Sequence, residues 1–206
     1  MNNEVVNKEP VNKEPAQSKI SSAFDYLEVL IIAVCVVLLL FSFVFRVCTV
    51  DGPSMENTLT EGETLIISNL FYTPQNGDIV VFHQTSETNE SYNKPLIKRI
   101  IATEGQWIKI TYGSQNSMSV YVSDDEIIDE SDLIDEPYAN LMDGSSAYYR
   151  NIDAVQVPEG CVFAMGDHRY HSADSRDPEI GFVDARRILG KVLIRLTPFS
   201  KFGVLN

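Results

Sequence analysis

The longest apolar run of the chain lies near its start, at 29–45, and its letters VLIIAVCVVLLLFSFVF include no charged residue. As a helix this run is about 25 Å long, and Tyr26 and Leu27 extend it towards the roughly 30 Å hydrocarbon core of a bilayer. A core helix of a soluble domain would show a polar face, and a cleaved secretory signal would have a shorter apolar core followed by small residues. The sequence therefore predicts a retained transmembrane anchor at 26–46.

The residues before this anchor are polar and repetitive, because the pentapeptide VNKEP occurs twice in succession. Proline, alternating charge and few large apolar groups cannot build a core, which predicts a disordered tail over 1–25. Lys13 and Lys19 precede the anchor closely, whereas Arg46 alone follows it. This slight excess of positive charge favours a cytoplasmic tail and an extracytoplasmic domain.

From residue 47 onward the pattern changes to short runs of β-branched and aromatic residues, separated by turn formers such as PQNG. We expect strands at 64–68, 77–84, 96–102, 107–113, 119–123, 161–167 and 191–196. Many short strands of this kind predict a mostly β domain over 47–206, built of folded antiparallel sheets or a barrel.

The net charge of the chain argues against nucleic acid as a partner. The net charge is −13 and no basic stripe offsets it, so a nucleic-acid backbone would be repelled and is not expected as a partner. Eight carboxylates and no Lys or Arg fall within 124–136, which predicts a solvated acidic loop region around 124–150. A calcium loop is the alternative, but this segment lacks the regular ligand spacing and the central glycine of such loops.

Cysteines and histidines show no recognisable metal motif. One of the three cysteines lies inside the apolar run, so only Cys48 and Cys161 are candidates for a disulfide, and the sequence leaves their pairing open. His168 and His171 are three residues apart with Asp167 beside them, and they would make a partial metal site at most. We predict no metal and no cofactor.

The stretch DGPSMENTL at 51–59 presents a candidate nucleophile, Ser54. A serine hydroxyl is a poor nucleophile until a neighbouring base takes its proton. Three histidines are candidates for that base, because the members of a catalytic triad need not be close in sequence: His83, His168 and His171.

A lysine is the other candidate base. In the stretch LIKRIIA, Leu96, Lys98 and Ile100 share one face of the expected strand, which places an amine among apolar side chains. Desolvation lowers the pKa of a lysine, and a neutral amine near physiological pH is a general base. The competing interpretation is an edge-strand lysine whose stem packs against the sheet while its amine reaches water.

A third stretch, MGDHRYHSADSRD at 165–177, holds many short polar groups and opposite charges directly after an apolar strand. It is typical either of a surface turn or of a buried polar scaffold that orients a catalytic side chain.

Taken together, GPSMENTL, GDIVVF, IKRII and GDHRYHSADSRD, in this order after one apolar span, resemble the bacterial type I signal peptidases. The resemblance runs from the span to near the C-terminus and includes VPEGCVFAMGD and GFVDARRILGKV. It implies a mostly β fold with a folded-sheet core. It also implies a serine endopeptidase that removes signal peptides from secreted preproteins at the outer face of the membrane.

The resemblance further implies roles for individual residues. Ser54 matches the nucleophile of a Ser/Lys dyad, Lys98 its general base, and Ser172 the serine that orients the lysine. The oxyanion region includes the backbone N–H of Ser54 and also Gly52, where some members carry a hydroxyl donor. Charged side chains match two supporting ion pairs, Asp174 with Arg176 and Asp167 with Arg99.

The substrates implied are preprotein signal peptides with small residues before the cleaved bond. Met55 and Ile97 are candidates to line the shallow pockets for those residues, or are plain core residues. Ser54 follows Arg46 by eight residues and so lies at most about 28 Å from it, which favours a bond close to the membrane lipid.

Departures from the family pattern, such as Asn57 and His168, motivate an alternative function. In that alternative the chain is a catalytically inactive, membrane-tethered β domain that acts as an assembly or interaction module. An enzyme of another mechanism, which uses Ser54 or Ser172 with His168 or His171, is a further alternative.

Overall fold

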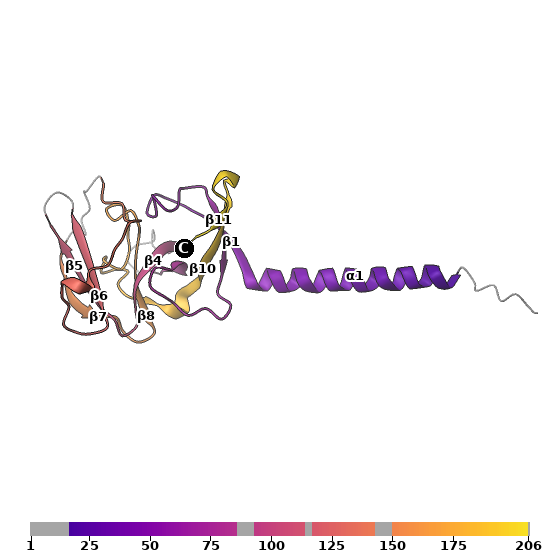
Figure 1. Cartoon of the computed structure of the whole chain (residues 1–206), viewed down its shortest axis with the longest axis horizontal. Coiled ribbons are helices and arrows are strands. Elements are labelled where there is room, and N and C mark those ends of the chain that lie inside the picture. Colours follow the sequence, from indigo (N-terminus) through magenta and orange to yellow (C-terminus); the bar gives the residue numbers. More distant parts are fainter. Residues whose placement is uncertain (1–16, 86–92, 114–116, 143–149, 206) are drawn as a thin grey trace, which may run out of the picture. The chain divides into compact units, whose positions relative to one another are not determined.

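The computed structural model describes residues 17–85, 93–113, 117–142 and 150–205, with side chains from residue 24 onward. The chain divides into two compact units, residues 1–43 and residues 44–206. The first unit holds one helix and the second holds all the strands, as Figure 1 shows.

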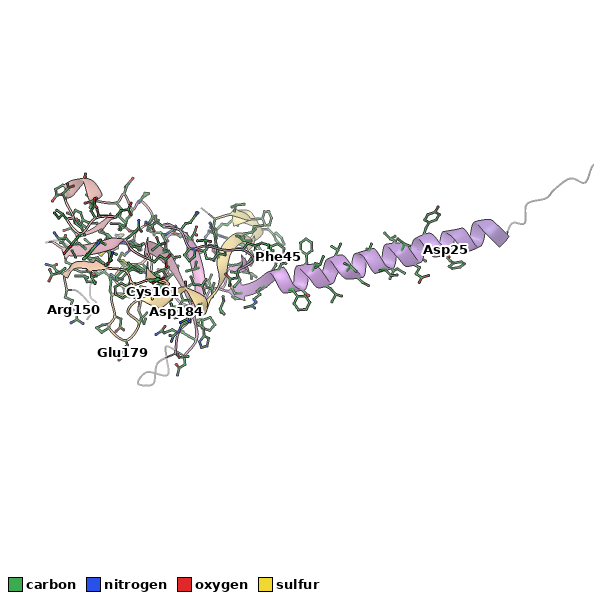
Figure 2. The ribbon with its side chains drawn as sticks, turned by 90° about the horizontal axis from the view of Figure 1, so that it is seen from below. Asp25, Phe45, Arg150, Cys161, Glu179 and Asp184 are labelled. Atoms are coloured by element: carbon green, nitrogen blue, oxygen red, sulfur yellow. The ribbon has the colours of Figure 1, made fainter. Side chains whose placement is uncertain are left out.

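The helix α1 (Gln17–Val44) contains a 21-residue segment, Phe24–Val44, that is long and apolar enough to cross a membrane. Its side chains project on all sides and those of residues 24–43 are almost all exposed (Figure 2). At 1.5 Å per residue this segment is about 31 Å long, close to the thickness of a hydrocarbon core.

The ends of the helix differ from the predicted boundaries. Residues 17–25, expected in the disordered tail, are helical, because the chain between Pro15 and Gly52 holds no proline or glycine to interrupt a helix. The rest of the expected tail, with the VNKEP repeat, lies outside the described residues. At the other end, Phe45 and Arg46 belong to a strand and not to the anchor.

The larger sheet is antiparallel throughout, in the order β1-β2-β10-β3-β4-β8-β9, with β11 added to β10. Its strands are β1 (Phe45–Thr49), β2 (Thr64–Ser68), β3 (Ile79–His83), β4 (Pro95–Thr103), β8 (Cys161–Met165), β9 (Val183–Asp184), β10 (Ile188–Thr197) and β11 (Gly203–Val204). The smaller sheet is the antiparallel set β6-β5-β7, formed by β5 (Trp107–Tyr112), β6 (Met118–Ser123) and β7 (Ile152–Gln156). Short 3-10 helices complete the described elements: η2 (Glu130–Asp132), η3 (Ala185–Arg187) and η4 (Phe199–Lys201).

The mostly β prediction is confirmed, and all seven expected strands are present. Four strands were not predicted, namely β1, β7, β9 and β11. β9 and β11 are two residues long, too short for a periodic pattern, and β1 continues directly from the apolar run. β7 is mostly exposed and includes Asp153, so its apolar signal is weak.

Both faces of the larger sheet are covered by apolar side chains. Val80 and Phe82 of β3 pack in one cluster with Leu96 of β4, whereas Ile79 and Val81 pack in a second cluster on the opposite face. This two-sided burial explains why β3 appears in the sequence as an unbroken apolar run. A third cluster joins the smaller sheet to β4 and β8 through Ile101, Ile108, Ile110, Val120, Phe163 and Met165.

The structure also bears on the candidate disulfide and on the acidic loop. Cys48 and Cys161 are both free thiols, so they form no disulfide with each other. Most side chains at 124–136 are exposed, as a solvated loop requires, but Glu136 is an exception whose side chain is only 10% exposed. It pairs with a buried arginine, and a carboxylate with such a partner tolerates burial.

Candidate active site

Ser54 lies in a tight turn between β1 and β2. Glu56 N–H donates to the carbonyl of Pro53 at 3.0 Å, and Leu59 N–H donates to the carbonyl of Met55 at 2.8 Å. The side chains of Met55 and Leu59 are fully buried in the core, which fixes the turn and leaves Ser54 half-buried. The nucleophile candidate is therefore held on a rigid support.

Lys98 lies in the middle of β4, between β3 and β8, and is only 2% exposed. Its Nζ donates to Ser54 Oγ at 2.8 Å and to the carbonyl of Ile97 at 2.8 Å. Burial lowers the pKa of Lys98 to about 8; the charges of Asp174 and Asp167 oppose this shift and those of Lys94 and Arg176 assist it. Near neutral pH a minor fraction of the amine, roughly a tenth at pH 7, is thus neutral and lies next to the serine hydroxyl.

Ser172 is buried, but its hydroxyl does not hydrogen-bond to the lysine. Its hydroxyl forms no hydrogen bond of standard geometry with any residue in the described part of the chain, although it lies close enough to Asp174 to help lower the pKa of that carboxyl. The amine of Lys98 is oriented instead by the Ile97 carbonyl. The lysine-orienting contact expected of Ser172 is therefore absent from this arrangement.

Gly166 is the point where the segment 166–177 touches the Ser54 turn. A Cβ at this position would collide with the Ser172 side chain and with the Ser54 carbonyl oxygen. The same carbonyl accepts a hydrogen bond from the backbone N–H of His168 at 3.1 Å. Only glycine allows the two segments to approach so closely.

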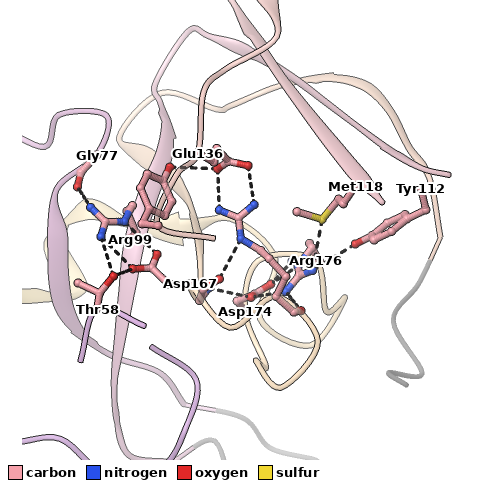
Figure 3. Close-up of polar contacts among 12 residues, drawn as sticks. Thr58, Gly77, Arg99, Tyr112, Met118, Glu136, Asp167, Asp174 and Arg176 are labelled. Atoms are coloured by element: carbon pink, nitrogen blue, oxygen red, sulfur yellow. Dashed lines mark hydrogen bonds and ion pairs between the residues drawn. The ribbon is translucent and has the colours of Figure 1, made fainter. Parts of the chain in front are cut away.

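Two buried ion pairs, Arg99 with Asp167 and Arg176 with Asp174, lie in the same part of the domain, and Figure 3 shows both. Asp167 accepts bonds from Arg99 Nε at 2.9 Å and Nη2 at 2.8 Å, and a third from the Thr58 hydroxyl at 2.6 Å. These bonds connect β4, the Ser54 turn and the segment 166–177.

The second pair joins Asp174 to Arg176 through two bonds of 2.8 Å. Burial alone would raise the pKa of Asp174, but the Arg176 guanidinium, the Gly166 N–H and the Ser172 hydroxyl outweigh it and keep the pKa below its ordinary value. Asp174 is thus a fixed negative charge close to Lys98.

A cleft of about 300 Å³ opens beside Ser54 and Lys98. Met55, Ile97 and Gly52 also line it, and Gly52 adopts a φ of +88°, a conformation that favours glycine. Asp51 and Lys94 form an exposed ion pair of 3.2 Å, and both line the cleft. The structure thus brings every predicted oxyanion and pocket residue to one cavity.

The three histidines are the other candidates for the base. His83 is exposed at the end of β3, and the buried ring of His168 lies near Glu56, with Nδ1 3.4 Å from Oε2. The rings of His168 and His171 have centroids 4.5 Å apart. Within the described residues, no imidazole is hydrogen-bonded to Ser54 or Ser172, which weakens a histidine-based mechanism.

Sequence reasoning missed Thr58, Glu136 and Tyr138, which contact the charged residues around the dyad. Glu136 closes an acidic run and Tyr138 is a single aromatic in a polar segment. Neither has a local signal, because each contact joins segments far apart in the sequence.

Comparison with known proteins identifies the family of the chain. The family model described as "Signal peptidase, peptidase S26" matches residues 23–197. The chain belongs to this family of signal peptidases. The family resemblance and the expected class of enzyme, a serine endopeptidase, are thereby confirmed, and the reaction of the family is the removal of signal peptides.

Individual relatives cover most of the chain. It is 36% identical to signal peptidase I of Bacillus caldolyticus over 84% of this chain and 90% of that protein. It is 32% identical to the probable signal peptidase I-1 of Synechocystis sp., over 88% of this chain and 86% of that protein. A solved signal peptidase I from Enterococcus faecalis is 25% identical and covers 58% of this chain and 97% of its own, with a TM-score of 0.41. The family assignment therefore depends on the sequence matches.

Proposed function

We propose that the signal peptidase cleaves its substrates with a Ser54/Lys98 dyad. The supporting observation is the 2.8 Å contact between Lys98 Nζ and Ser54 Oγ, made by an amine that is buried and has a lowered pKa. A neutral amine at this distance can accept the serine proton.

In the first half of the reaction, Lys98 takes the proton from Ser54 Oγ as the oxygen attacks the scissile carbonyl carbon. The C–N bond then breaks, Lys98 gives its proton to the leaving amine, and the signal peptide remains as an ester on Ser54. In the second half, Lys98 takes a proton from water while the water oxygen attacks the ester. The proton passes to Ser54 Oγ as the signal peptide leaves as a free acid.

The tetrahedral intermediates carry a negative oxygen that needs hydrogen-bond donors. The backbone N–H of Ser54 suits this role, since it donates to no other residue in the described parts of the chain. Gly52 lines the same cleft and supplies no side-chain donor, so the hole depends on main-chain N–H groups.

The cleft favours small residues before the cleaved bond. Met55 and Ile97 line the cleft together with the dyad, and Met55 is fixed in the core. A bulky side chain would have to displace a packed residue, which costs typically about 1–3 kcal/mol. Preproteins whose signal peptides end in small residues are thus the proposed substrates.

The active site works close to a lipid surface in this proposal. The apolar helix ends at Val44, and the eight residues from Arg46 to Ser54 reach at most about 28 Å. We place the N-terminus in the cytoplasm and the catalytic domain outside, from the lysines that precede the span. The scissile bond would then lie just beyond the substrate's own membrane segment.

Cleavage of a preprotein with an Ala-x-Ala junction tests the dyad, using the full chain in detergent. Ser54→Ala and Lys98→Ala should each lower kcat by about 1000-fold or more, because members of a catalytic unit are not interchangeable. The wild-type rate should rise with pH through about 8, as Lys98 loses its proton.

Other outcomes point to the alternatives. Activity that persists in Lys98→Ala but disappears in His168→Ala would indicate a histidine base. A folded wild-type chain that cleaves no preprotein would indicate a tethered interaction module.

A further inference from the structure

The segment Glu136–Asn140, which we call the strap, contacts the charged residues around the dyad. Its first residue, Glu136, accepts bonds of 2.6 Å from both Nη1 and Nη2 of Arg169 (Figure 3). The Arg169 side chain is completely buried, and its Nε donates to the carbonyl of Gly166 at 3.1 Å. Glu136 therefore supplies the counter-charge of an arginine that holds the Gly166 backbone.

The centre of the strap is an aromatic ring between two guanidinium groups. The ring of Tyr138 lies 4.0 Å from Cζ of Arg99 and 5.8 Å from Cζ of Arg169, measured to its centroid. Its hydroxyl donates to Glu136 Oε1 at 3.0 Å. Desolvated contacts of this type are among the stronger cation–π interactions.

The end of the strap is fixed through its backbone. Asn140 N–H donates to the Asp167 carbonyl at 2.7 Å, and Arg169 N–H donates to the Asn140 carbonyl at 3.0 Å. These two bonds form a parallel bridge that leaves His168 between them, with its own N–H on the Ser54 carbonyl. His168 therefore connects the two segments: its neighbours on either side bond to Asn140 of the strap, and its own N–H bonds to the Ser54 turn.

The residues that the strap contacts are the neighbours of the dyad. Arg99 follows Lys98 on β4, and Asp167 joins Arg99 to Thr58 in the Ser54 turn. No strap residue lines the cleft where the substrate would lie. Any influence of the strap on the reaction must therefore pass through the position of Ser54 and Lys98 and not through contact with the peptide.

We propose that the strap is a positioning element for the dyad, in which Glu136 and Tyr138 act through Arg169 and Arg99. This proposal rests on the proposed Ser54/Lys98 chemistry and goes beyond it. The charges of Glu136 and Arg169 are buried at a desolvation cost, and apolar residues of similar volume often stabilise a fold equally well. The two bonds between Glu136 and Arg169, together with the Tyr138 ring, instead fix the positions of the two arginine side chains. Catalysis needs its reacting groups to be held in position this accurately.

The test compares Tyr138→Leu and Glu136→Gln with two matched controls. Tyr138→Phe keeps the ring above Arg99, and Glu126→Gln removes an exposed carboxylate from the same acidic run. A synthetic peptide spanning an Ala-x-Ala junction is cleaved by each full-length variant in detergent, at a temperature well below its melting transition.

We expect kcat to fall about tenfold in Tyr138→Leu and Glu136→Gln, with KM unchanged. The midpoint of the pH–rate profile, expected near the Lys98 pKa of about 8 in the wild type, should rise in both variants, because a looser scaffold admits water to the Lys98 amine. Tyr138→Phe and Glu126→Gln should match the wild type within about twofold.

The outcomes separate the two proposals. If Lys98→Ala is inactive but Tyr138→Leu keeps the wild-type kcat and midpoint, the positioning role is overturned while the dyad stands. A lower melting temperature alone would mean that the strap is merely structural. If Lys98→Ala stays active, the dyad itself fails and the strap proposal fails with it. Should Glu136→Gln not fold, the comparison of Tyr138→Leu with Tyr138→Phe decides.

Discussion

The amine of Lys98 is buried away from water, and burial of this ionisable group lowers the free energy of unfolding. Burial lowers its pKa from the ordinary 10.5 to about 8. Between these two pH values the unfolded chain binds a proton that the folded chain does not, so the free energy of unfolding rises with pH across this window. Below pH 8 the full cost applies, about 3 kcal/mol at roughly 1.36 kcal/mol per pKa unit.

Lys98→Met should therefore stabilise the fold while it abolishes cleavage. We expect a gain of about 3 kcal/mol at pH 7, shrinking towards zero as the pH passes 10.5. Thermal or urea unfolding of the full chain in detergent at pH 7 and pH 10 measures this gain in the free energy of unfolding. Lys109→Met, which replaces a half-buried lysine on β5, serves as the control. A variant that is less stable than the wild type at pH 7 would contradict this account.

At the scale of strands and loops, the sequence predicts the elements that have a local periodic pattern and misses contacts between distant segments. The buried run of β3 and the lone charge of Lys98 on an apolar face were visible in the sequence, and the strands lie where those patterns indicated. The strap was not visible, since Glu136 ends an acidic run that resembles a solvated loop. Its partner Arg169 follows 33 residues later, and nothing in either segment alone indicates the contact.

The candidate site residues Ser54 and Ser172 show the same limit within the site. Motif order was enough to name both residues. The motif could not show that the Ile97 carbonyl holds the Lys98 amine while the Ser172 hydroxyl stays unbonded among the described residues. Such bonds depend on how closely the segment 166–177 approaches the Ser54 turn. That distance is set by tertiary packing and leaves no local pattern in the sequence.

That approach gives a prediction for Gly166→Ala. The added Cβ would collide with the Ser172 side chain and the Ser54 carbonyl, so the segment must retreat from the turn. We expect kcat to fall at least about 100-fold, because misplacement by about 1 Å is that costly, and stability to fall by about 1–3 kcal/mol. Gly203→Ala is the control, since a Cβ there meets nothing within 4 Å. Full peptide-cleaving activity in Gly166→Ala would show that the close contact is dispensable.

At the scale of the whole molecule, the helix and the β domain are separate compact units. All three hydrophobic clusters draw their residues from 44–206, and so do the dyad, its ion pairs and the cleft. Folding and bond cleavage should therefore need no residue of the helix. The helix would serve instead to bring the site to membrane-bound substrates.

Removing residues 1–43 tests this division. The remaining chain should fold, and it should cleave a soluble Ala-x-Ala peptide with a kcat/KM within about threefold of the full chain, because every core and catalytic contact is retained. Cleavage of a preprotein embedded in lipid vesicles should fall much further, since enzyme and substrate no longer share a surface that raises their effective concentration. The truncated Lys98→Ala variant gives the background rate. A truncated chain that is folded but equally fast on vesicle-bound preprotein would mean that the anchor contributes nothing to substrate encounter.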